Sequence, residues 1–382
     1  MTEIVKGFRD VENASKKVAI KNIIEDTFRS YNYNPVETPI IETEGFVRGN
    51  NSDDEAVSSI FKLQDRGKRK LALRYEFTFQ LKRLAKNKKL PYKRYQIGEV
   101  FRDEPIGPNR WRQFTQCDVD VVGSSIKDEA EILKITSDIL RKLKIDFVIN
   151  FNNRKLLNEI LDDCNINDKE SVIREIDKLD KLSEKDVKRN LKNFNAEKVL
   201  TIFKRPEKYF EKFESYSEVK ELKKYCKMLG VKVNFQPFLA RGLSYYNGSI
   251  FEIKSKGLKQ TITAGGSYLN NGIQSTGISF GLDRLELLAD IGDYNSKCLV
   301  VSLGQDKKAI EIAEKVREFV SCSVFYGKPG KALDYANSYG IGKVIFIGDE
   351  EVKKNKFKVK DMDSGKEKFI SEKNLSKEFV KY

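Results

Sequence analysis

The amino-acid sequence predicts an α+β fold divided into about two or three domains. Up to residue 151, strand-like segments with alternating side chains lie between amphipathic helices. Residues 152–230 change to a polar, Lys- and Glu-rich helical stretch, which we interpret as an insertion. From residue 297, short apolar strands alternate with helices. We therefore expect one domain over residues 1–296, interrupted by the insertion, and a second over 297–382.

The elements of the first half follow from hydrophobic periodicity and from turn residues. Apolar side chains recur at helical spacing before Pro35, which begins an extended segment. A loop with Pro105, Gly107 and Pro108 separates two strong strand signals. The expected elements are a helix at 11–31, an extended segment at 36–42, a hairpin at 59–76, a basic helix at 78–88, strands at 92–104 and 109–123, and a helix at 127–144.

After the insertion, strand signals return and lead to a glycine-rich turn and a helix that includes Gly277 and Gly281. The last part reads as a β-α-β-α-β unit closed by a hairpin. The expected elements are strands at 231–236, 249–254, 259–264, 298–303, 321–325 and 343–347, helices at 277–285, 307–319 and 330–339, and a turn at 363–365.

Composition narrows the class of function. Lys and Arg total 71 against 57 Asp and Glu, a net charge of +14 that favours polyanionic partners such as nucleic acid. A lysine-rich proteome with a solvated surface explains the same charge equally well. The basic run from Lys82 to Arg94 and the region after residue 297 are the candidates to face RNA. The sequence contains no histidine, which excludes an imidazole base or a His-ligated metal. The five scattered cysteines, the lack of a signal peptide and the lack of a long apolar run favour a cytoplasmic protein without a membrane segment.

The most informative segment is 99–123. Alternate residues of a strand share a face, so Gln116, Asp118 and Asp120 lie together, and both faces mix charged, aromatic and amide side chains. Such a strand suits the floor of a polar ligand pocket. Arg102 and Arg110, on either side of the loop, are spaced to clamp a triphosphate. A salt-bridged sheet surface is the alternative reading.

Three glycine-containing segments carry weaker signals. Segment 240–252 sets Arg241 beside a glycine and a pair of tyrosines, which suits an anion near the backbone. Segments 263–268 and 277–285 combine close-packing glycines with Tyr268 and Arg284. Taken singly, each is equally explained by a structural turn or by tight packing.

The joint arrangement resembles the class II aminoacyl-tRNA synthetases. YNPVETPIIE (33–42) is similar to their motif 1, with Pro39 as its proline. Segment 99–123 is similar to motif 2, which implies that Arg102 holds the α-phosphate of ATP and that Glu104 and Arg110 help to place ATP. GISFGLDRL (277–285) resembles motif 3, which implies that Arg284 stacks on adenine and touches the γ-phosphate.

Two further segments resemble the histidine-specific motifs of histidyl-tRNA synthetases. LARGLSYYNG (239–248) implies that Arg241 replaces a metal ion at the α-phosphate and that two tyrosines enclose the substrate imidazole. TAGGSY (263–268) contributes a pocket tyrosine, and LRYEFT (73–78) an acidic residue for the substrate amino group. The histidine-binding residues implied are Glu76, Thr78, Gln116, Asp120, Arg241, Tyr245, Tyr246 and Tyr268.

The chain departs from the family pattern at three positions. Ser244 replaces the aspartate of RGLDYY, while Ser267 and Leu269 replace the arginine and the aspartate of AGGRYD. QCDVDVVG (116–123) is similar to the archaeal and eukaryotic branch of the family. The three replacements, at positions 244, 267 and 269, leave the implied phosphate arginines and pocket tyrosines in place.

The resemblance implies a class II antiparallel sheet with flanking helices, a helical insertion and a C-terminal α/β anticodon-binding domain. It further implies a cytoplasmic homodimer that uses ATP with Mg²⁺ to join histidine to tRNA(His). Two alternatives remain: a synthetase-like regulatory subunit of histidine biosynthesis, and a non-catalytic tRNA-binding or sensing module. The first typically lacks the C-terminal domain, and the second is expected to lose the phosphate arginines; this sequence keeps both features.

Overall fold

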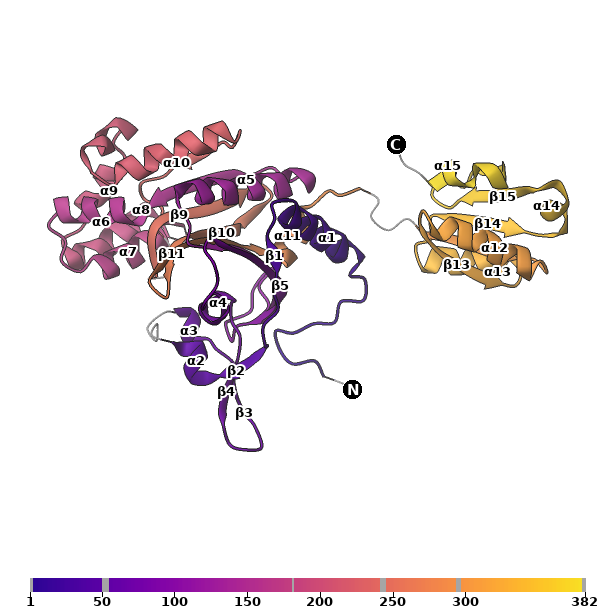
Figure 1. Ribbon diagram of the computed structural model, residues 1–382, viewed down its shortest axis with the longest axis horizontal. Coiled ribbons are helices and arrows are strands. Elements are labelled where there is room, and N and C mark those ends of the chain that lie inside the picture. The colour runs from indigo at the N-terminus through magenta and orange to yellow at the C-terminus, as the bar shows by residue number, and fades with distance from the viewer. Residues whose placement is uncertain (1–2, 50–54, 181, 241–244, 293–296, 380–382) are drawn as a thin grey trace. The chain divides into compact units, whose positions relative to one another are not determined.

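The computed structural model describes residues 3–49, 55–180, 182–240, 245–292 and 297–379. The chain divides into two compact units, Met1–Ile291 and Gly292–Tyr382 (Figure 1). No helix in the described ranges is long and apolar enough to cross a membrane. The combination of a large central sheet, flanking helices and a separate α/β unit confirms the predicted α+β class.

An eight-stranded sheet forms the centre of the first unit, in the order β1-β5-β6-β11-β10-β9-β7-β8. Its inner pairs are antiparallel, while the short edge strands β1 and β8 pair in parallel. The strands are β1 Asn34–Pro35, β5 Tyr92–Phe101, β6 Gln113–Val122, β7 Val148–Asn153, β8 Asn234–Phe235, β9 Tyr246–Ser255, β10 Leu258–Asn270 and β11 Ile273–Gly281.

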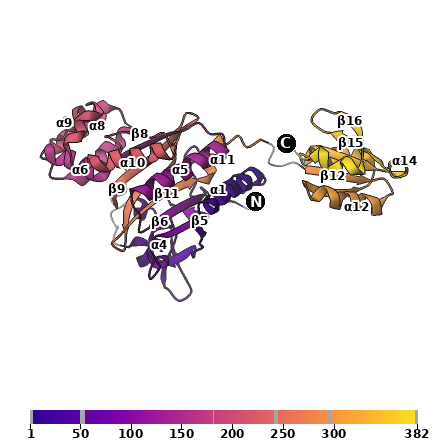
Figure 2. The ribbon, with the colours of Figure 1, turned by 45° about the horizontal axis from the view of Figure 1, so that its top comes forward.

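Helices α1 (Ser15–Ser30), α5 (Ile126–Lys142) and α11 (Leu282–Leu288) cover one face of this sheet (Figures 1 and 2). Cys117, Val119 and Val121 of β6 point into this layer and are fully buried. Burial of apolar area in this layer provides the main stabilisation of the unit. The alternate residues of β6 must therefore face the other side of the sheet.

A smaller three-stranded sheet, β2-β4-β3, lies beside α2 (Glu44–Arg48), α3 (Glu55–Ser58) and α4 (Thr78–Leu84). Its strands are β2 Ile41–Thr43, β3 Lys62–Gln64 and β4 Lys70–Leu73, and β3 and β4 form the hairpin that projects in Figure 1. Buried Gln80 of α4 donates to the carbonyl of Pro39 at 2.8 Å. This contact ties the segment before β2 to α4.

The polar stretch after β7 is helical. It packs on the main core through buried side chains such as Leu157, Ile173 and Leu222. Its elements are α6 Arg154–Asp163, α7 Lys169–Asp177, η1 Lys178–Asp180, α8 Glu184–Leu191, η2 Lys192–Phe194, α9 Lys198–Phe203, η3 Glu207–Lys212 and α10 Tyr216–Met228.

The second unit is a five-stranded sheet, β13-β12-β14-β15-β16, with helices on both faces. The parallel strands and the closing hairpin match the pattern expected after residue 297. The elements are β12 Lys297–Ser302, α12 Asp306–Arg317, β13 Ser321–Tyr326, α13 Pro329–Ser338, β14 Lys343–Ile347, α14 Asp349–Lys354, β15 Lys356–Asp361, β16 Glu367–Ser371, η4 Glu372–Asn374 and α15 Leu375–Phe379.

Three local predictions were wrong. The strand expected from residue 109 begins at Gln113, because Gly107 and Arg110 close a tight turn before it. The glycine-rich segment 263–268 is part of β10, and residues 277–281 are strand rather than helix. Glycines that suggested turns or a helix interior instead permit close approach within the sheet: a Cβ at Gly265 would lie 2.1 Å from the carbonyl oxygen of Gly277.

Candidate active site

The face of β6 turned away from the helical layer carries buried polar side chains. Gln116, Asp118 and Asp120 are each at most 6% exposed. The opposite face is apolar from Cys117 to Val121, so the expectation that both faces mix charged, aromatic and amide groups was wrong for this part of the strand. The polar side chains are concentrated on one face because the other packs against α1 and α5.

Asp120 lies at the centre of this face. The hydroxyl of Tyr268, on β10, donates to Asp120 Oδ1 at 2.5 Å. Gly277 of β11 is the register partner of Asp120, and a Cβ at Gly277 would lie 2.0 Å from Asp120 Oδ1. The glycine therefore makes the space in which the carboxylate lies.

Three aromatic rings line the same region. The centroids of Tyr245 and Tyr246 are 4.8 Å apart, and those of Tyr245 and Tyr268 are 5.9 Å apart with edge-to-face geometry. Burial raises the pKa of Tyr245 and of Tyr268, and nearby Glu76 raises both further. The rings therefore keep their protons, which makes Tyr268 a hydrogen-bond donor to Asp120. The structure thus brings together Asp120, Tyr245, Tyr246 and Tyr268, which were predicted from three separate segments.

Gln116 connects this region to the end of β5. Its Nε2 donates to Ser279 Oγ at 2.5 Å and to Asp118 Oδ1 at 3.3 Å, while Arg102 Nη2 lies 3.5 Å from its Oε1. The Arg102 guanidinium also lies 5.2 Å from the ring centroid of Phe114. Arg102 is therefore beside the polar face, where a ligand anion would be in reach.

The other predicted arginines lie at the margin. Arg110 is outside β6, exposed, and paired with Glu104 through its Nε at 2.9 Å. Arg284 of α11 donates to the carbonyl of Thr261 at 2.6 Å. It packs over Gly281, the register partner of Gln116, where a Cβ would lie 3.7 Å from Arg284 Cδ. Arg110 is thus close to Glu104, and Arg284 is close to Gln116.

The remaining predicted residues have fewer described contacts with this polar face. Thr78 begins α4 and is half-buried. Glu76, two residues earlier, interacts electrostatically with the pocket tyrosines. Arg241 and the departure at Ser244 lie outside the described residues.

Arg94 ends the basic run that the sequence suggested as RNA-facing, but it is fully buried and lies directly beside this site, so that expectation was wrong for Arg94. Arg94 of β5 is the register partner of Asp120, and its Nη2 is 2.7 Å from Asp120 Oδ2. Burial raises the pKa of both aspartates, that of Asp118 to about 7, and Arg94 opposes this shift in each. A signal was present, because Arg94 and Arg102 are an even number of residues apart and so share a strand face.

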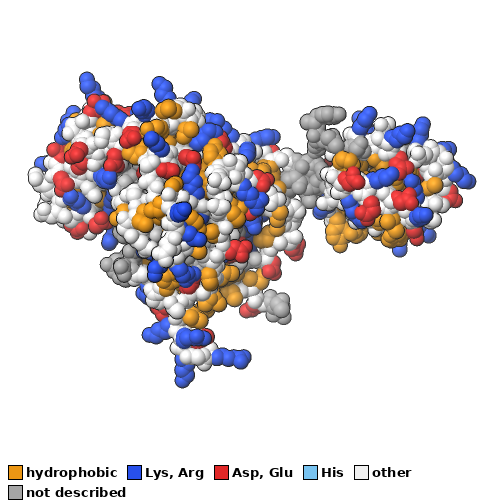
Figure 3. Space-filling model, in the orientation of Figure 1, with side chains coloured by type: hydrophobic (Ala, Val, Ile, Leu, Met, Phe, Trp, Pro, Cys, Tyr) orange, Lys and Arg blue, Asp and Glu red, His pale blue; other side chains and the backbone are white. Residues whose placement is uncertain are grey.

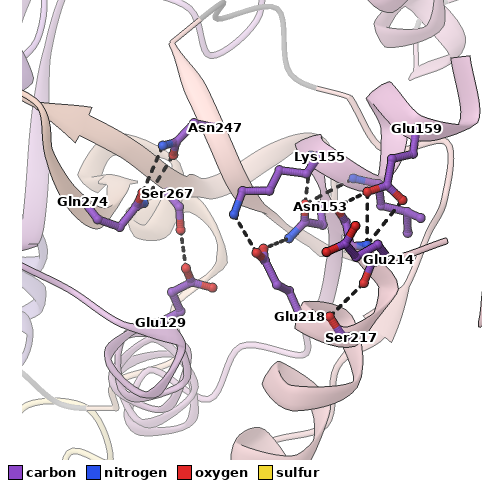
Figure 4. Close-up of polar contacts among 12 residues, drawn as sticks. Glu129, Asn153, Lys155, Glu159, Glu214, Ser217, Glu218, Asn247, Ser267 and Gln274 are labelled. Atoms are coloured by element: carbon purple, nitrogen blue, oxygen red, sulfur yellow. Dashed lines mark hydrogen bonds and ion pairs between the residues drawn. The ribbon is translucent and has the colours of Figure 1, made fainter. Parts of the chain in front are cut away.

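The departure at Ser267 lies on the other face of β10, toward α5 (Figure 4). Its hydroxyl donates to Oε1 of Glu129, which is 5% exposed. Burial raises the pKa of Glu129 to about 7, while Ser249 and Ser267 oppose the shift. Ser267 therefore supports the sheet from the side opposite Tyr268.

Comparisons with known proteins identify the family. The family described as "Histidyl-tRNA synthetase" matches residues 7–285, and "Anticodon binding domain" matches residues 297–382. The chain is 34% identical to "Histidine--tRNA ligase 1" of Bacillus cereus, over 98% of each chain. It is 32% identical to "Histidine--tRNA ligase" of Clostridium acetobutylicum, over 96% of this chain and 97% of that one.

Solved structures show the same fold. A histidyl-tRNA synthetase from Nostoc sp. PCC 7120 superposes with a TM-score of 0.85 at 24% identity, covering 99% of this chain and 98% of that one. A Bacillus halodurans C protein described as an "ATP phosphoribosyltransferase regulatory subunit/histidyl-tRNA synthetase" gives 0.73 at 20% identity, covering 91% of this chain and 98% of that one. The family match over most of the chain and the full-length relatives agree: this chain belongs to the histidyl-tRNA synthetase family.

Proposed function

We propose that this chain activates histidine with ATP to histidyl-adenylate and transfers the histidyl group to the 3′ end of tRNA(His). The observation that carries the proposal is the convergence of Gln116, Asp120, Tyr245 and Tyr268 on one buried polar face. A buried carboxylate anchored by a tyrosine suits an imidazole N–H, and the surrounding pocket of three tyrosines suits a flat ring. Arg102 lies at the edge of the same face.

In the first step the carboxylate of histidine attacks the α-phosphorus of ATP in line and expels pyrophosphate. This carboxylate is already ionised at neutral pH, so the step needs no general base. Catalysis then depends on orienting the reactants and on stabilising charge on the phosphoryl oxygens. We assign that role to Arg102 and Arg241, while Glu104, Arg110 and Arg284 hold the rest of ATP.

Histidine is held by side chains that complement its imidazole ring, its amino group and its carboxylate. Asp120 accepts the imidazole N–H, and Tyr268, Tyr245 and Tyr246 enclose the ring. Glu76, Thr78 and Gln116 contact the substrate amino and carboxylate groups. A wrong amino acid would leave Asp120 buried without its partner, which costs binding energy.

ATP brings Mg²⁺ as part of the substrate. Within the described ranges, His, Cys, Asp and Glu side chains form no group of three or more that would hold a metal. The arginines of this chain act on the phosphates directly.

The partners follow from the same assignment. We propose residues 1–296 as the catalytic domain, with an insertion at 152–230, and 297–382 as the anticodon-binding domain. A cytoplasmic location suits this reaction and the five free cysteines. The segment QCDVDVVG (116–123) favours the archaeal and eukaryotic branch of the family. The relatives named above are bacterial, so this part of the proposal rests on that segment alone.

A homodimer is supported by one face of the three-stranded sheet. Ile41 pairs with Leu73 and Leu63 pairs with Leu71, so the register sets these four apolar side chains on the same face. Ile41 is 50% exposed and Leu63 is 39% exposed. An apolar strand face next to the motif 1 segment suits a second copy of the chain.

Amino-acid-dependent ATP–pyrophosphate exchange tests the proposal. Exchange with histidine alone is the expected result, and exchange with none of the standard amino acids would contradict it and revive the regulatory alternative. Removing residues 297–382 should spare exchange and weaken tRNA charging. Equal loss of both activities would contradict the division of roles between the two domains.

A further inference from the structure

Arg94 is a fully buried arginine inside the sheet. Its exposure is 0%, and it lies in the middle of β5, directly opposite Asp120 in the register with β6. Burial of a guanidinium is costly unless charge compensates it. Its compensation comes from the carboxylates of Asp120 and Asp118, on the same face of the neighbouring strand.

The contact between Arg94 and Asp120 is close but leaves hydrogen-bonding capacity unused. Arg94 Nη2 lies 2.7 Å from Asp120 Oδ2. Within the described part of the chain, neither Oδ2 nor the three guanidinium nitrogens have an aligned hydrogen-bond partner. Asp120 Oδ1, in contrast, is occupied by the hydroxyl of Tyr268. One oxygen is thus fixed by a hydrogen bond and the other by charge.

We propose that Arg94 is a positioning residue for histidine selection: it keeps the buried Asp120 carboxylate ionised and oriented to accept the substrate imidazole N–H. This inference rests on the proposed function. Arg94 has no contact with substrate in this role and acts through Asp120. An arginine suits it because a guanidinium stays charged when buried, and its planar fork holds a fixed geometry beside a carboxylate.

Several titratable groups act on this pair and belong in any account of its pH dependence. Asp118 is the second carboxylate beside Arg94, and Arg102 favours the charged form of Asp118. Glu76 acts on Tyr268, which contacts Asp120. The charged or titratable neighbours are Tyr33, Glu76, Tyr92, Arg102, Asp118 and Tyr268.

The test compares Arg94→Met and Arg94→Lys with the wild type in histidine-dependent ATP–pyrophosphate exchange, from about pH 6 to 9. Without the guanidinium, Asp120 should bind a proton at neutral pH. The KM for histidine of R94M should therefore rise about tenfold or more at pH 7 and fall toward the wild-type value as the pH increases. The KM for ATP should stay within about twofold.

R94K keeps a positive charge and is the milder change for folding. Its histidine KM should rise less than that of R94M, and its pH profile should follow the wild type. Arg154→Met is the matched control, because Arg154 is also buried, at 3% exposure, but pairs with Glu170 in the insertion. It should leave both KM values and the pH profile unchanged.

Each outcome decides the question. A wild-type histidine KM and pH profile in R94M or, where R94M does not fold, a wild-type KM in R94K would overturn the inference. Equal losses for histidine and ATP at every pH would reduce Arg94 to a structural role and also overturn it. A wild-type enzyme that exchanges with no amino acid would instead refute the proposed function.

Discussion

Two buried carboxylates, Asp120 on one face of the central sheet and Glu129 of α5 against the other, are held in different ways. Asp120 has a guanidinium nitrogen 2.7 Å from one oxygen and a tyrosine hydroxyl on the other. Glu129, beneath the sheet, faces the hydroxyls of Ser249 and Ser267. The described residues bring no cation within ion-pair distance of Glu129, and its nearest charges, Lys155 and Glu218, pair with each other at 2.5 Å (Figure 4).

The difference between the two carboxylates indicates which of them must stay charged. Burial raises the pKa of both groups, but a cation in contact opposes the rise only at Asp120. Recognition of an imidazole N–H requires an ionised acceptor, whereas a carboxyl that only supports the sheet functions as a neutral acid. The family usually has an arginine where this chain has Ser267, and here the groups that face Glu129 are the hydroxyls of Ser249 and Ser267. The surface of this unit shows many Lys and Arg side chains (Figure 3), but Asp120 pairs instead with the buried Arg94.

The largest effect is expected from Asp120→Asn. Losing the charged acceptor should lower kcat/KM for histidine by about a thousandfold or more, roughly 4 kcal/mol, because the imidazole loses its partner in a buried site. The KM for ATP should change by less than about twofold. Exchange rates across histidine concentrations measure this effect. Asp65→Asn, in the β3–β4 turn, is the control, and an unchanged histidine KM in D120N would refute the assignment of Asp120.

Glu129→Gln tests the other carboxylate through stability. The folded-state pKa of Glu129, about 7, lies above its ordinary value of 4.5. Its contribution to stability is therefore complete below about pH 4.5 and is lost as the pH rises through about 7. E129Q should remove this decline and be more stable than the wild type at pH 8, by up to about 3 kcal/mol.

Urea unfolding at several pH values measures this difference. Glu131→Gln, on the same helix and paired with Lys93, should keep the wild-type decline. The histidine KM of E129Q should stay within about twofold of wild type, since Glu129 lies on the other face of the sheet. A decline that persists in E129Q would show that another group causes it.

Tyr268→Phe weakens the support of Asp120 without removing its charge. The hydroxyl donates to Oδ1 at 2.5 Å, and a charge-assisted hydrogen bond contributes about 1.5–3 kcal/mol. We expect about a tenfold rise in the histidine KM with an unchanged KM for ATP. Tyr31→Phe, whose hydroxyl donates to Asp138 on the helical side, is the matched control. Equal effects of the two substitutions would contradict a specific role of Tyr268.

Much of this arrangement was predictable from sequence, for reasons that differ between elements. Alternation in β6 set Gln116 and Asp120 on one face, since strand periodicity is local information. The apolar opposite face was not foreseen, because Thr115 and Gln113 masked the run of Cys117, Val119 and Val121. Its burial depends on packing against α1, which is distant in sequence, and against α5, which folds back onto the sheet.

The glycine segments show the limit of local reasoning. Gly265 and Gly277 looked like a turn and a helix interior, but they lie side by side in neighbouring strands. Nothing near Gly277 in sequence indicates that Asp120 would occupy the space its missing side chain leaves. The place of Arg94 in this site was missed for the same reason: its partner is 26 positions away, and only the β5–β6 register pairs them.

The smallest effect is expected from Ser267→Ala, which removes a hydroxyl partner of Glu129. The hydroxyl favours the charged form of Glu129, so its loss should raise the pKa of Glu129 further and extend the decline in stability to higher pH. Unfolding at about pH 8 should show a loss of about 1 kcal/mol, and at about pH 5 a smaller one. Ser275→Ala, also buried but bonded to the carbonyl of Ile273, should cost the same at both pH values. A pH-independent loss in S267A would mean that Glu129 does not titrate in this range and would remove the contrast between the two carboxylates.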